Sequence, residues 1–262
     1  MVSVMRSPTT LPVVAVASGK GGVGKTSVAV GLARRLGSVG CRVGLVDADL
    51  YGPDVPRMLG IRRDIPAASV TVANWGGRSR AADLQAAEVD GIKVASLGFL
   101  IGGNQGISVG APIGALLLRR LVCDTDWGEL DGFVIDLPPG TGEIHQSLLG
   151  IFDRIAVLLV VTPAEVAHLD TSRALTVLNT AHATVLGGVE NMSYLRCGHC
   201  GERMALHPDT PADRTIWSRG VPKLASLPFR PDGVIPDAEL DAVVAVAQRY
   251  FRVDGDPPRD GR

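Results

Sequence analysis

The stretch Gly19-Lys-Gly-Gly-Val-Gly-Lys-Thr26 decides the fold class of this chain of 262 residues. It satisfies the pattern G-x-x-x-x-G-K-[ST], in which glycines let the backbone curl so that several N–H groups point at phosphate oxygens. The apolar run Val13–Ala17 before it predicts a buried strand, and Gly24–Leu36 after it predicts a helix. Because a helix N-terminus carries partial positive charge, this order predicts a nucleotide-phosphate site. A glycine-rich turn that binds nothing is the alternative.

The side chains at the end of this loop have separate predicted roles. Lys25 is expected to reach the β- and γ-phosphates and to act in catalysis, and the Thr26 hydroxyl is expected to bind Mg²⁺. The predicted nucleotide-binding set also contains the remaining loop positions, which are Gly19, Lys20, Gly21, Gly22, Val23, Gly24 and Ser27.

Short apolar runs alternate with helical patterns along most of the chain. The runs are continuous, as in strands covered on both faces. Further strands are predicted at Arg42–Val46, Ile92–Leu97, Gly132–Leu137, Ile155–Val161 and Val185–Val189. Further helices are predicted at Ile113–Leu121, Glu165–Ala181, Ala212–Ser218 and Ala238–Phe251. This alternation predicts an α/β fold of three layers, with a mostly parallel β-sheet and helices on both faces.

The domain organisation is predicted to be simple. We expect one P-loop ATPase domain over residues 1–252, with a cysteine-bearing insertion at about 194–211, and a disordered tail over 253–262. The segments Arg62–Gly91 and Cys197–Pro211 are expected to be irregular.

Acidic residues end two of the predicted strands, where a parallel sheet presents its carboxyl edge. Asp47 and Asp49 follow one strand, and a carboxylate there can orient or deprotonate an attacking water. Asp136 ends another and is predicted to hold Mg²⁺ through a water molecule. Gly140, in the Pro-Pro-Gly turn that follows, is predicted to contact phosphate through its backbone.

Charge and composition exclude several function classes. The net charge of −1 gives no electrostatic footprint for nucleic acid or for an anionic membrane. The longest apolar run, Ile155–Val161, is far shorter than the ~18 residues that span a bilayer. With four cysteines and no secretory signal pattern, we expect a cytoplasmic protein with reduced thiols that binds neither nucleic acid nor membrane.

The second lysine of the loop, Lys20, adds a resemblance. The loop resembles the deviant Walker A signature of the superfamily of the nitrogenase iron protein, MinD and ParA. This resemblance implies an ATP-dependent homodimer in which Lys20 crosses the interface to the nucleotide of the partner, and a fold of the P-loop NTPase type.

Further segments resemble the Mrp/ApbC family of iron–sulfur cluster carriers. They are Asp47–Gly60, Trp127–Asp131, Asp136–Gly142, Thr162–Ala167 with Asp170, Val189–Tyr194 and Cys197–Cys200. The resemblance implies an ATPase that holds a [4Fe–4S] cluster between two subunits and exchanges it with cluster donors and apo iron–sulfur proteins. It also implies that Asn191 contacts adenine and that Asp49, more than Asp47, positions the attacking water.

The pair Cys197 and Cys200 supplies two thiolates, whereas a cubane cluster or a tetrahedral zinc site usually needs four ligands. A two-fold dimer brings two such pairs together. Three other interpretations stay open: zinc, bound by four thiolates or by one pair with His199 or His207; dithiol redox catalysis; and unliganded thiols.

The remaining cysteines and histidines are predicted to be structural. Cys41 and Cys123 are expected to be small buried residues, and His145, His168 and His182 to be surface or capping residues. Two other function classes stay open beside the carrier: a nucleotide-switched regulator like MinD or ParA, and a zinc-bound ATPase with a protein partner.

Overall fold

The computed structural model describes residues 8–49, 52–61, 84–96, 111–140, 150–208 and 210–252. Within these residues the main sheet has nine strands in the order β10-β9-β8-β1-β7-β2-β5-β4, and β11 pairs with β9. Their bounds are β1 Val13–Ala17, β2 Val43–Asp47, β4 Ala87–Val89, β5 Ile92–Ser96, β7 Gly132–Asp136, β8 Ile155–Val161, β9 Thr184–Arg196, β10 Arg203–Ala205 and β11 Lys223–Pro228. A small second sheet pairs β3 Leu84–Gln85 with β6 Thr125–Asp126.

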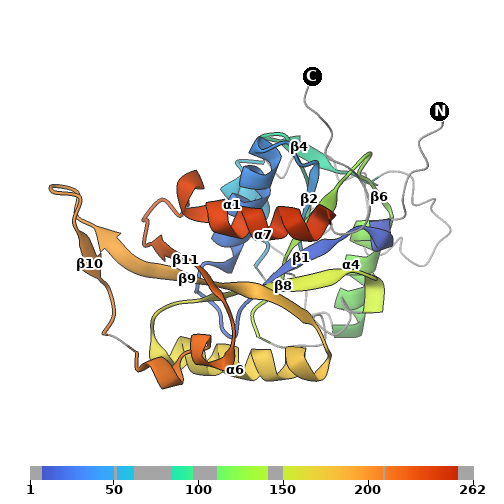
Figure 1. Ribbon diagram of the computed structural model, residues 1–262. Coiled ribbons are helices and arrows are strands. Elements are labelled where there is room, and N and C mark those ends of the chain that lie inside the picture. The colour runs from blue at the N-terminus through green and yellow to red at the C-terminus, as the bar shows by residue number, and fades with distance from the viewer. Residues whose placement is uncertain are drawn as a thin grey trace.

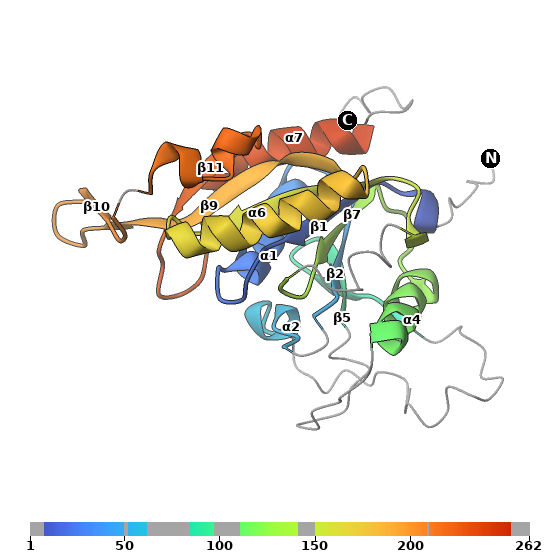
Figure 2. The same ribbon diagram turned by 90° about the horizontal axis from the view of Figure 1, so that it is seen from below.

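Helices cover both faces of the main sheet (Figures 1 and 2). On one face lie α1 Lys25–Ser38 and α7 Asp241–Arg252, and on the other lie α4 Ala111–Cys123 and α6 Glu165–Thr180. Two apolar cores fill the spaces between these layers, one built on α1 and α7 and the other on α4 and α6. Short helical turns complete the described chain: α2 Val55–Met58, η1 Pro8–Thr10, η3 Ala212–Arg214, η4 Trp217–Arg219 and η5 Asp237–Leu240. The predicted three-layer α/β fold is confirmed.

The parallel register brings the predicted acids and the glycine loop to one edge. Asp136 of β7 pairs with Asp47 of β2 on one side and with Val16 of β1 on the other. The loop that follows β1 therefore emerges directly beside both carboxylates. This edge is where open α/β sheets bind their ligands.

Strand β9 is longer than predicted, because it pairs with β10 and β11, two strands that were not predicted. Its residues 184–190 pair with β8, its residues 188–194 pair with β11, and its end pairs with β10 in antiparallel register. The strand thus continues beyond Val189 to Arg196, and the resulting hairpin projects from the body of the molecule (Figure 1). The segment Cys197–Pro211, predicted to be irregular, contains β10.

Two further segments correct the sequence interpretation. The predicted helix Ala212–Ser218 is two 3₁₀ turns, because hydroxyl groups take its carbonyls: Thr215 donates to the Ala212 carbonyl, and Ser218 to that of Thr215. The end of Arg62–Gly91 is a strand pair rather than irregular, since β4 turns into β5. The rest of that segment, residues 62–83, lies outside the described residues, as does the predicted tail over 253–262.

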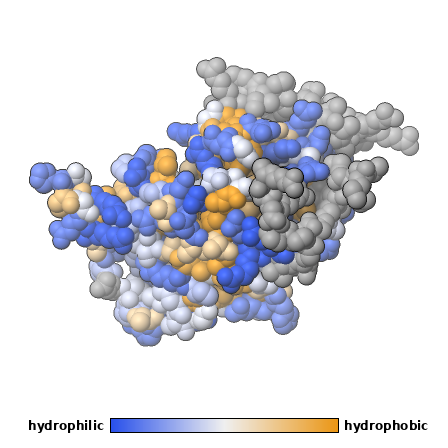
Figure 3. Space-filling view, turned by 45° about the horizontal axis from the view of Figure 1, so that its top comes forward, coloured by the Kyte–Doolittle hydropathy of each residue, from blue (hydrophilic) through white to orange (hydrophobic). Residues whose placement is uncertain are grey.

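On the face shown in Figure 3, hydrophilic and apolar residues form separate patches. Of the helices in the described ranges, none combines the length and the apolar character needed to cross a lipid bilayer. The apolar runs of the sequence are the buried strands of the sheet, of which Val13–Ala17 is an example.

Candidate functional site

The loop between β1 and α1 needs glycine for two different reasons. Gly22 and Gly24 have φ values of 78° and 80°, in the left-handed region where a side chain is strained. A Cβ on Gly19 would lie 2.3 Å from the backbone of α6 at Asp170 and Thr171. At Gly24 a Cβ would lie 2.2 Å from the side-chain nitrogen of Asn191. The loop is therefore held closely between α6 and β9.

Lys25 and Asp136 form a buried ion pair at the centre of the site. Their Nζ and Oδ1 atoms lie 2.7 Å apart, and the side chains are only 7% and 1% exposed. Burial raises the pKa of Asp136, while Lys25 and the Thr26 hydroxyl act in the opposite direction. The second oxygen, Oδ2, is buried and has no hydrogen-bond partner among the described residues. An unpaired carboxylate oxygen beside Thr26 fits the donors that Mg²⁺ prefers.

Asn191 joins strand β9 to the glycine loop. Its side-chain nitrogen donates to the carbonyl of Val23 at 2.9 Å, and the side chain is buried. Elsewhere in the loop, Ser18 donates to the carbonyl of Lys20 at 2.9 Å. All the predicted nucleotide-binding positions of the loop lie at this edge of the sheet, with Val23 and Lys25 buried and Gly21 and Gly22 exposed.

The two acids after β2 have different surroundings. Asp47 is fully buried and accepts hydrogen bonds from the Ser96 hydroxyl and from the N–H groups of Asp49 and Val55. Burial, together with the charge of Asp136, raises the pKa of Asp47 to about 8. Asp49 is only half-buried and accepts from the N–H of Gly52 at 3.2 Å.

Gly140 does not offer its backbone donor freely in this conformation. Its φ is 90°, and its N–H donates to the carbonyl of Ser18 at 3.0 Å. The predicted contact with phosphate would require this hydrogen bond to break.

The cysteine pair lies at the tip of the β9–β10 hairpin. The N–H of Cys197 donates to the backbone carbonyl of Glu202 at 2.8 Å, and the N–H of Gly201 donates to the backbone carbonyl of Cys197 at 2.9 Å. The backbone N–H groups of Cys200 and His199 lower the pKa of the Cys197 thiol, because they stabilise the thiolate. The thiolate is the form of cysteine that binds metals, and a lowered pKa makes that form more available.

The described residues of one chain supply too few ligands for a complete metal site at the cysteine pair. Cys197 is half-buried and Cys200 is exposed, and His199 and His207 are exposed as well. Over the described ranges, no cluster of three or more histidine, cysteine, aspartate or glutamate side chains could hold a metal ion. Two cysteine thiols are what each copy of the described chain brings to such a site.

The remaining cysteines and histidines correct some expectations. Cys41 and Cys123 are half-buried rather than fully buried. His168 was predicted to be a surface or capping residue. It is buried completely rather than at the surface, and its Nδ1 accepts from the N–H of Ile216, the residue that precedes η4. His182 is exposed, as predicted, and His145 lies outside the described residues.

The structure adds residues that the sequence did not indicate. The Ser96 hydroxyl donates to Asp47, because the pairing of β5 with β2 places the two residues side by side. Tyr194 donates to Glu239 at 3.0 Å, and Arg196 approaches the same carboxylate at 3.2 Å. These contacts attach the base of the cysteine hairpin to η5. The tyrosine was within a recognised motif, but its partner lies 45 residues away in sequence.

Comparison with known proteins gives the relatives of this chain. The family model described as "ParA: NUBPL iron-transfer P-loop NTPase" matches residues 10–249. An "Iron-sulfur cluster carrier protein" of Pyrococcus horikoshii is 35% identical over 217 residues, which are 82% of this chain and 73% of that protein. A chloroplastic "Fe-S cluster assembly factor HCF101" of Oryza sativa subsp. japonica is 35% identical over 91% of this chain but only 44% of its own length.

Solved structures agree on the fold. A nucleotide-binding protein in complex with ADP from Archaeoglobus fulgidus has a TM-score of 0.66 and 29% identity, covering 96% of this chain and 92% of that one. The septum site-determining protein MinD of Pyrococcus horikoshii, complexed with Mg-ADP, has a TM-score of 0.58 at 23% identity, covering 92% and 93%. The second likeness concerns the fold alone. With a matching glycine loop, acids at the strand ends and a family model that spans nearly the whole chain, this protein belongs to the NUBPL-type iron-transfer P-loop NTPases.

Proposed function

We propose that this protein is a Mg-ATP-hydrolysing carrier of iron–sulfur clusters, and that two copies hold one [4Fe–4S] cluster between them for delivery to apo-proteins. The observation that carries the proposal is the pair Cys197 and Cys200. It lies on a projecting hairpin, the pKa of the Cys197 thiol is lowered, and the described residues of one chain offer no group of three or more metal ligands. A cluster shared across a two-fold axis completes the four thiolates that a cubane needs.

The nucleotide site supports hydrolysis by residues of this chain. On nucleotide binding, Lys25 would leave its ion pair with Asp136 and neutralise charge on the phosphates. Asp136 and Thr26 would then hold Mg²⁺. When bound, Mg²⁺ would supply positive charge for the phosphate oxygens. Asp49 is our candidate to orient the attacking water, since Asp47 is buried and already accepts three hydrogen bonds.

The dimer is part of the same proposal. Lys20 is half-buried at the same edge of the sheet as the nucleotide loop, and we propose that it reaches the nucleotide of the partner subunit. Asn191, which contacts the loop through Val23, is proposed to contact the base. Nucleotide binding and pairing of the two cysteine hairpins would then favour the same assembled state.

Iron, sulfide and zinc analysis of the reconstituted protein tests the cargo. The protein is purified without oxygen, reconstituted with iron and sulfide, and analysed together with a Cys197→Ser/Cys200→Ser variant. We expect about four irons and four sulfides per dimer, and loss of both in the variant. The matched control is Cys41→Ser/Cys123→Ser, which removes the other two cysteines and should keep the cluster.

The outcomes separate the alternatives. Zinc in place of iron would support a zinc-bound ATPase, and a protein without metal would support a nucleotide-switched regulator. Cluster loss in the Cys41→Ser/Cys123→Ser control would contradict the assignment of the ligands. A second assay measures cluster transfer to an apo-ferredoxin: Lys25→Ala should still assemble the cluster but transfer it without stimulation by ATP.

A further inference from the structure

Strand β9 contains a bulge directly beside the glycine loop, the β9 bulge of residues 191–193. Between Ser226 and Pro228, β11 has one residue where β9 has these three, so the parallel pairing is interrupted there. A bulge bends its strand and re-aims side chains, and bulges are common next to functional sites. Within the β9 bulge, Met192 has a φ of 56°, in the left-handed region that residues other than glycine rarely adopt.

The left-handed residue turns two successive side chains toward the same glycine. In a regular strand, neighbouring side chains point to opposite faces. A Cβ on Gly24 would instead lie 2.2 Å from the amide nitrogen of Asn191 and 3.4 Å from the Cε methyl group of Met192. Gly24 is the N-cap of α1, and its carbonyl accepts from the N–H of Val28 at 3.1 Å. The β9 bulge therefore rests on the residue at which the phosphate loop becomes a helix.

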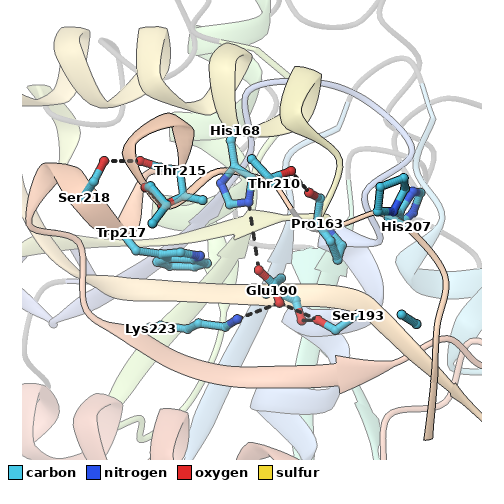
Figure 4. A pocket seen from close by; sticks show the side chains of 13 residues that line it. Pro163, His168, Glu190, Ser193, His207, Thr210, Thr215, Trp217, Ser218 and Lys223 are labelled. Atoms are coloured by element: carbon cyan, nitrogen blue, oxygen red, sulfur yellow. Dashed lines mark hydrogen bonds and ion pairs between the residues drawn. The ribbon is translucent and has the colours of Figure 1, made fainter.

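Fixed contacts on both sides of the β9 bulge hold its left-handed residue in place. On one side, the Glu190 carboxylate accepts from Lys223 at 2.6 Å and lies 3.0 Å from the Ser193 hydroxyl (Figure 4). On the other side, the carbonyl of Tyr194 accepts from the N–H of Phe229 at 2.7 Å. A residue in a sparsely populated backbone region costs free energy and persists only where its surroundings determine it. The β9 bulge thus stores strain between two firmly held parts of the strand.

Only a short length of chain separates the β9 bulge from the cysteines. Cys197 follows Met192 by five residues, which is at most about 17 Å of extended backbone. A change of Met192 from the left-handed to the extended region, which strands prefer, would redirect the residues that follow it and turn the hairpin. The contact between the Met192 methyl group and Gly24 opposes this change.

We propose that Met192 is a positioning residue through which an occupied phosphate loop restrains the cysteine hairpin. Phosphate contacts fix the loop at Gly24, and the fixed glycine holds the Met192 methyl group and with it the β9 bulge. In an empty loop Gly24 moves more freely, so Met192 leaves the left-handed conformation more often and the hairpin that carries Cys197 moves. This coupling rests on the proposed nucleotide binding, but it does not depend on what the cysteines hold.

Alkylation of Cys197 by iodoacetamide, followed by peptide mass spectrometry, measures this restraint in the full chain without metal at the cysteines. The rate is compared with and without saturating Mg-ADP, a probe that leaves no γ-phosphate to hydrolyse. We expect Mg-ADP to slow the reaction roughly fivefold, at the lower end of ordinary coupling between two sites. Met192→Asn places a residue that tolerates the left-handed region but lacks the methyl group, so in this variant Mg-ADP should hardly change the rate.

Three further variants separate the contact with Gly24 from general damage. Met192→Leu restores an apolar side chain of similar volume and should keep the slowing by Mg-ADP. His182→Asn is the matched control, because His182 is also left-handed, with a φ of 53°, and is exposed just after the end of α6. This control should keep the slowing as well. Met192→Gly, which also accepts the left-handed region, tests the loss of slowing a second time if Met192→Asn does not fold.

Calorimetry of Mg-ADP binding to each protein keeps the outcomes distinct. A protein that binds no Mg-ADP would contradict the proposed function together with the coupling. Binding without slowing, or equal slowing in Met192→Asn, would overturn the coupling alone. The rates are also measured at two protein concentrations roughly tenfold apart, because a slowing that disappears on dilution would come from pairing of subunits and would overturn the role of Met192.

Discussion

Replacing Lys25 by methionine removes the cation from a buried ion pair and leaves its carboxylate partner in place. Lys25 Nζ and Asp136 Oδ1 lie 2.7 Å apart, and both side chains are nearly inaccessible. Methionine keeps most of the volume of lysine, so the change is chiefly electrostatic. Breaking a buried pair on one side typically costs about 3–5 kcal/mol of unfolding free energy.

For Lys25→Met we expect a loss of unfolding free energy at the lower end of the range of about 3–5 kcal/mol. Burial already raises the pKa of Asp136, so the carboxyl group can take up a proton when its cation is removed. We expect Lys25→Met to lower the free energy of unfolding by about 3 kcal/mol near neutral pH, and by less at about pH 5, where the proton is more available. Asp136→Asn in the same chain removes the buried charge, so the double variant should recover about 2 kcal/mol.

Urea denaturation of the nucleotide-free protein, followed by circular dichroism, measures these quantities. The four proteins of the double-mutant cycle are compared near neutral pH and at about pH 5. Lys20→Met is the matched control, since Lys20 belongs to the same loop but lies outside this ion pair, and it should cost less than about 1 kcal/mol. Additive effects of Lys25→Met and Asp136→Asn, with no dependence on pH, would refute the reasoning.

Three further predictions concern the loop, the buried acid and the hairpin. Gly24→Ala should abolish ATP binding in calorimetry, because its Cβ would lie 2.2 Å from the asparagine amide of β9, whereas Gly150→Ala, outside the loop and with nothing within 4 Å of its Cβ, should bind normally. The pKa of Asp47 is raised from 3.8 to about 8, so this group holds a proton in the folded state that it loses on unfolding. The free energy of unfolding should therefore fall between these two pH values, by up to about 1.4 kcal/mol per pH unit. Urea denaturation should show a smaller fall for Asp47→Asn. Cys197, whose pKa is lowered, should be alkylated by iodoacetamide faster than Cys123, whose pKa burial raises; equal rates by peptide mass spectrometry would contradict the lowered pKa of Cys197.

The central strands and the glycine loop were predictable because their signals are local. The runs at Val13–Ala17 and Ile155–Val161 are apolar without interruption, and both strands have the predicted bounds. An acidic residue at the end of such a strand lies at the carboxyl edge of the parallel sheet, and this does not depend on the order of the other strands. Asp136 could therefore be placed beside the loop from its position in sequence alone.

The features that were missed depend on partners distant in sequence. The second half of β9 is polar around Asn191 and Ser193, so its strand structure comes from pairing with the distant strand β11, Lys223–Pro228, rather than from its own pattern. His168 is polar and was predicted to be a surface or capping residue, but Ile216 supplies a backbone donor that allows its complete burial. Neither contact has a signature in the neighbouring residues.

The arrangement of the two proposed sites limits how one can influence the other. Asn191 lies on β9 and Cys197 directly follows its end, six residues further on, which is at most about 20 Å of backbone. Over this distance a phosphate charge screened by solvent has little direct effect on the thiolates. Influence has to pass through the strand and its side-chain anchors: Asn191 holds it to the loop, and Tyr194 holds it to Glu239 of η5, a turn that packs on α1 through Leu240. Because α1 begins in the phosphate loop, both anchors lead back to the nucleotide, and a change there would reach the cysteines as a movement of the hairpin rather than as a change in their chemistry.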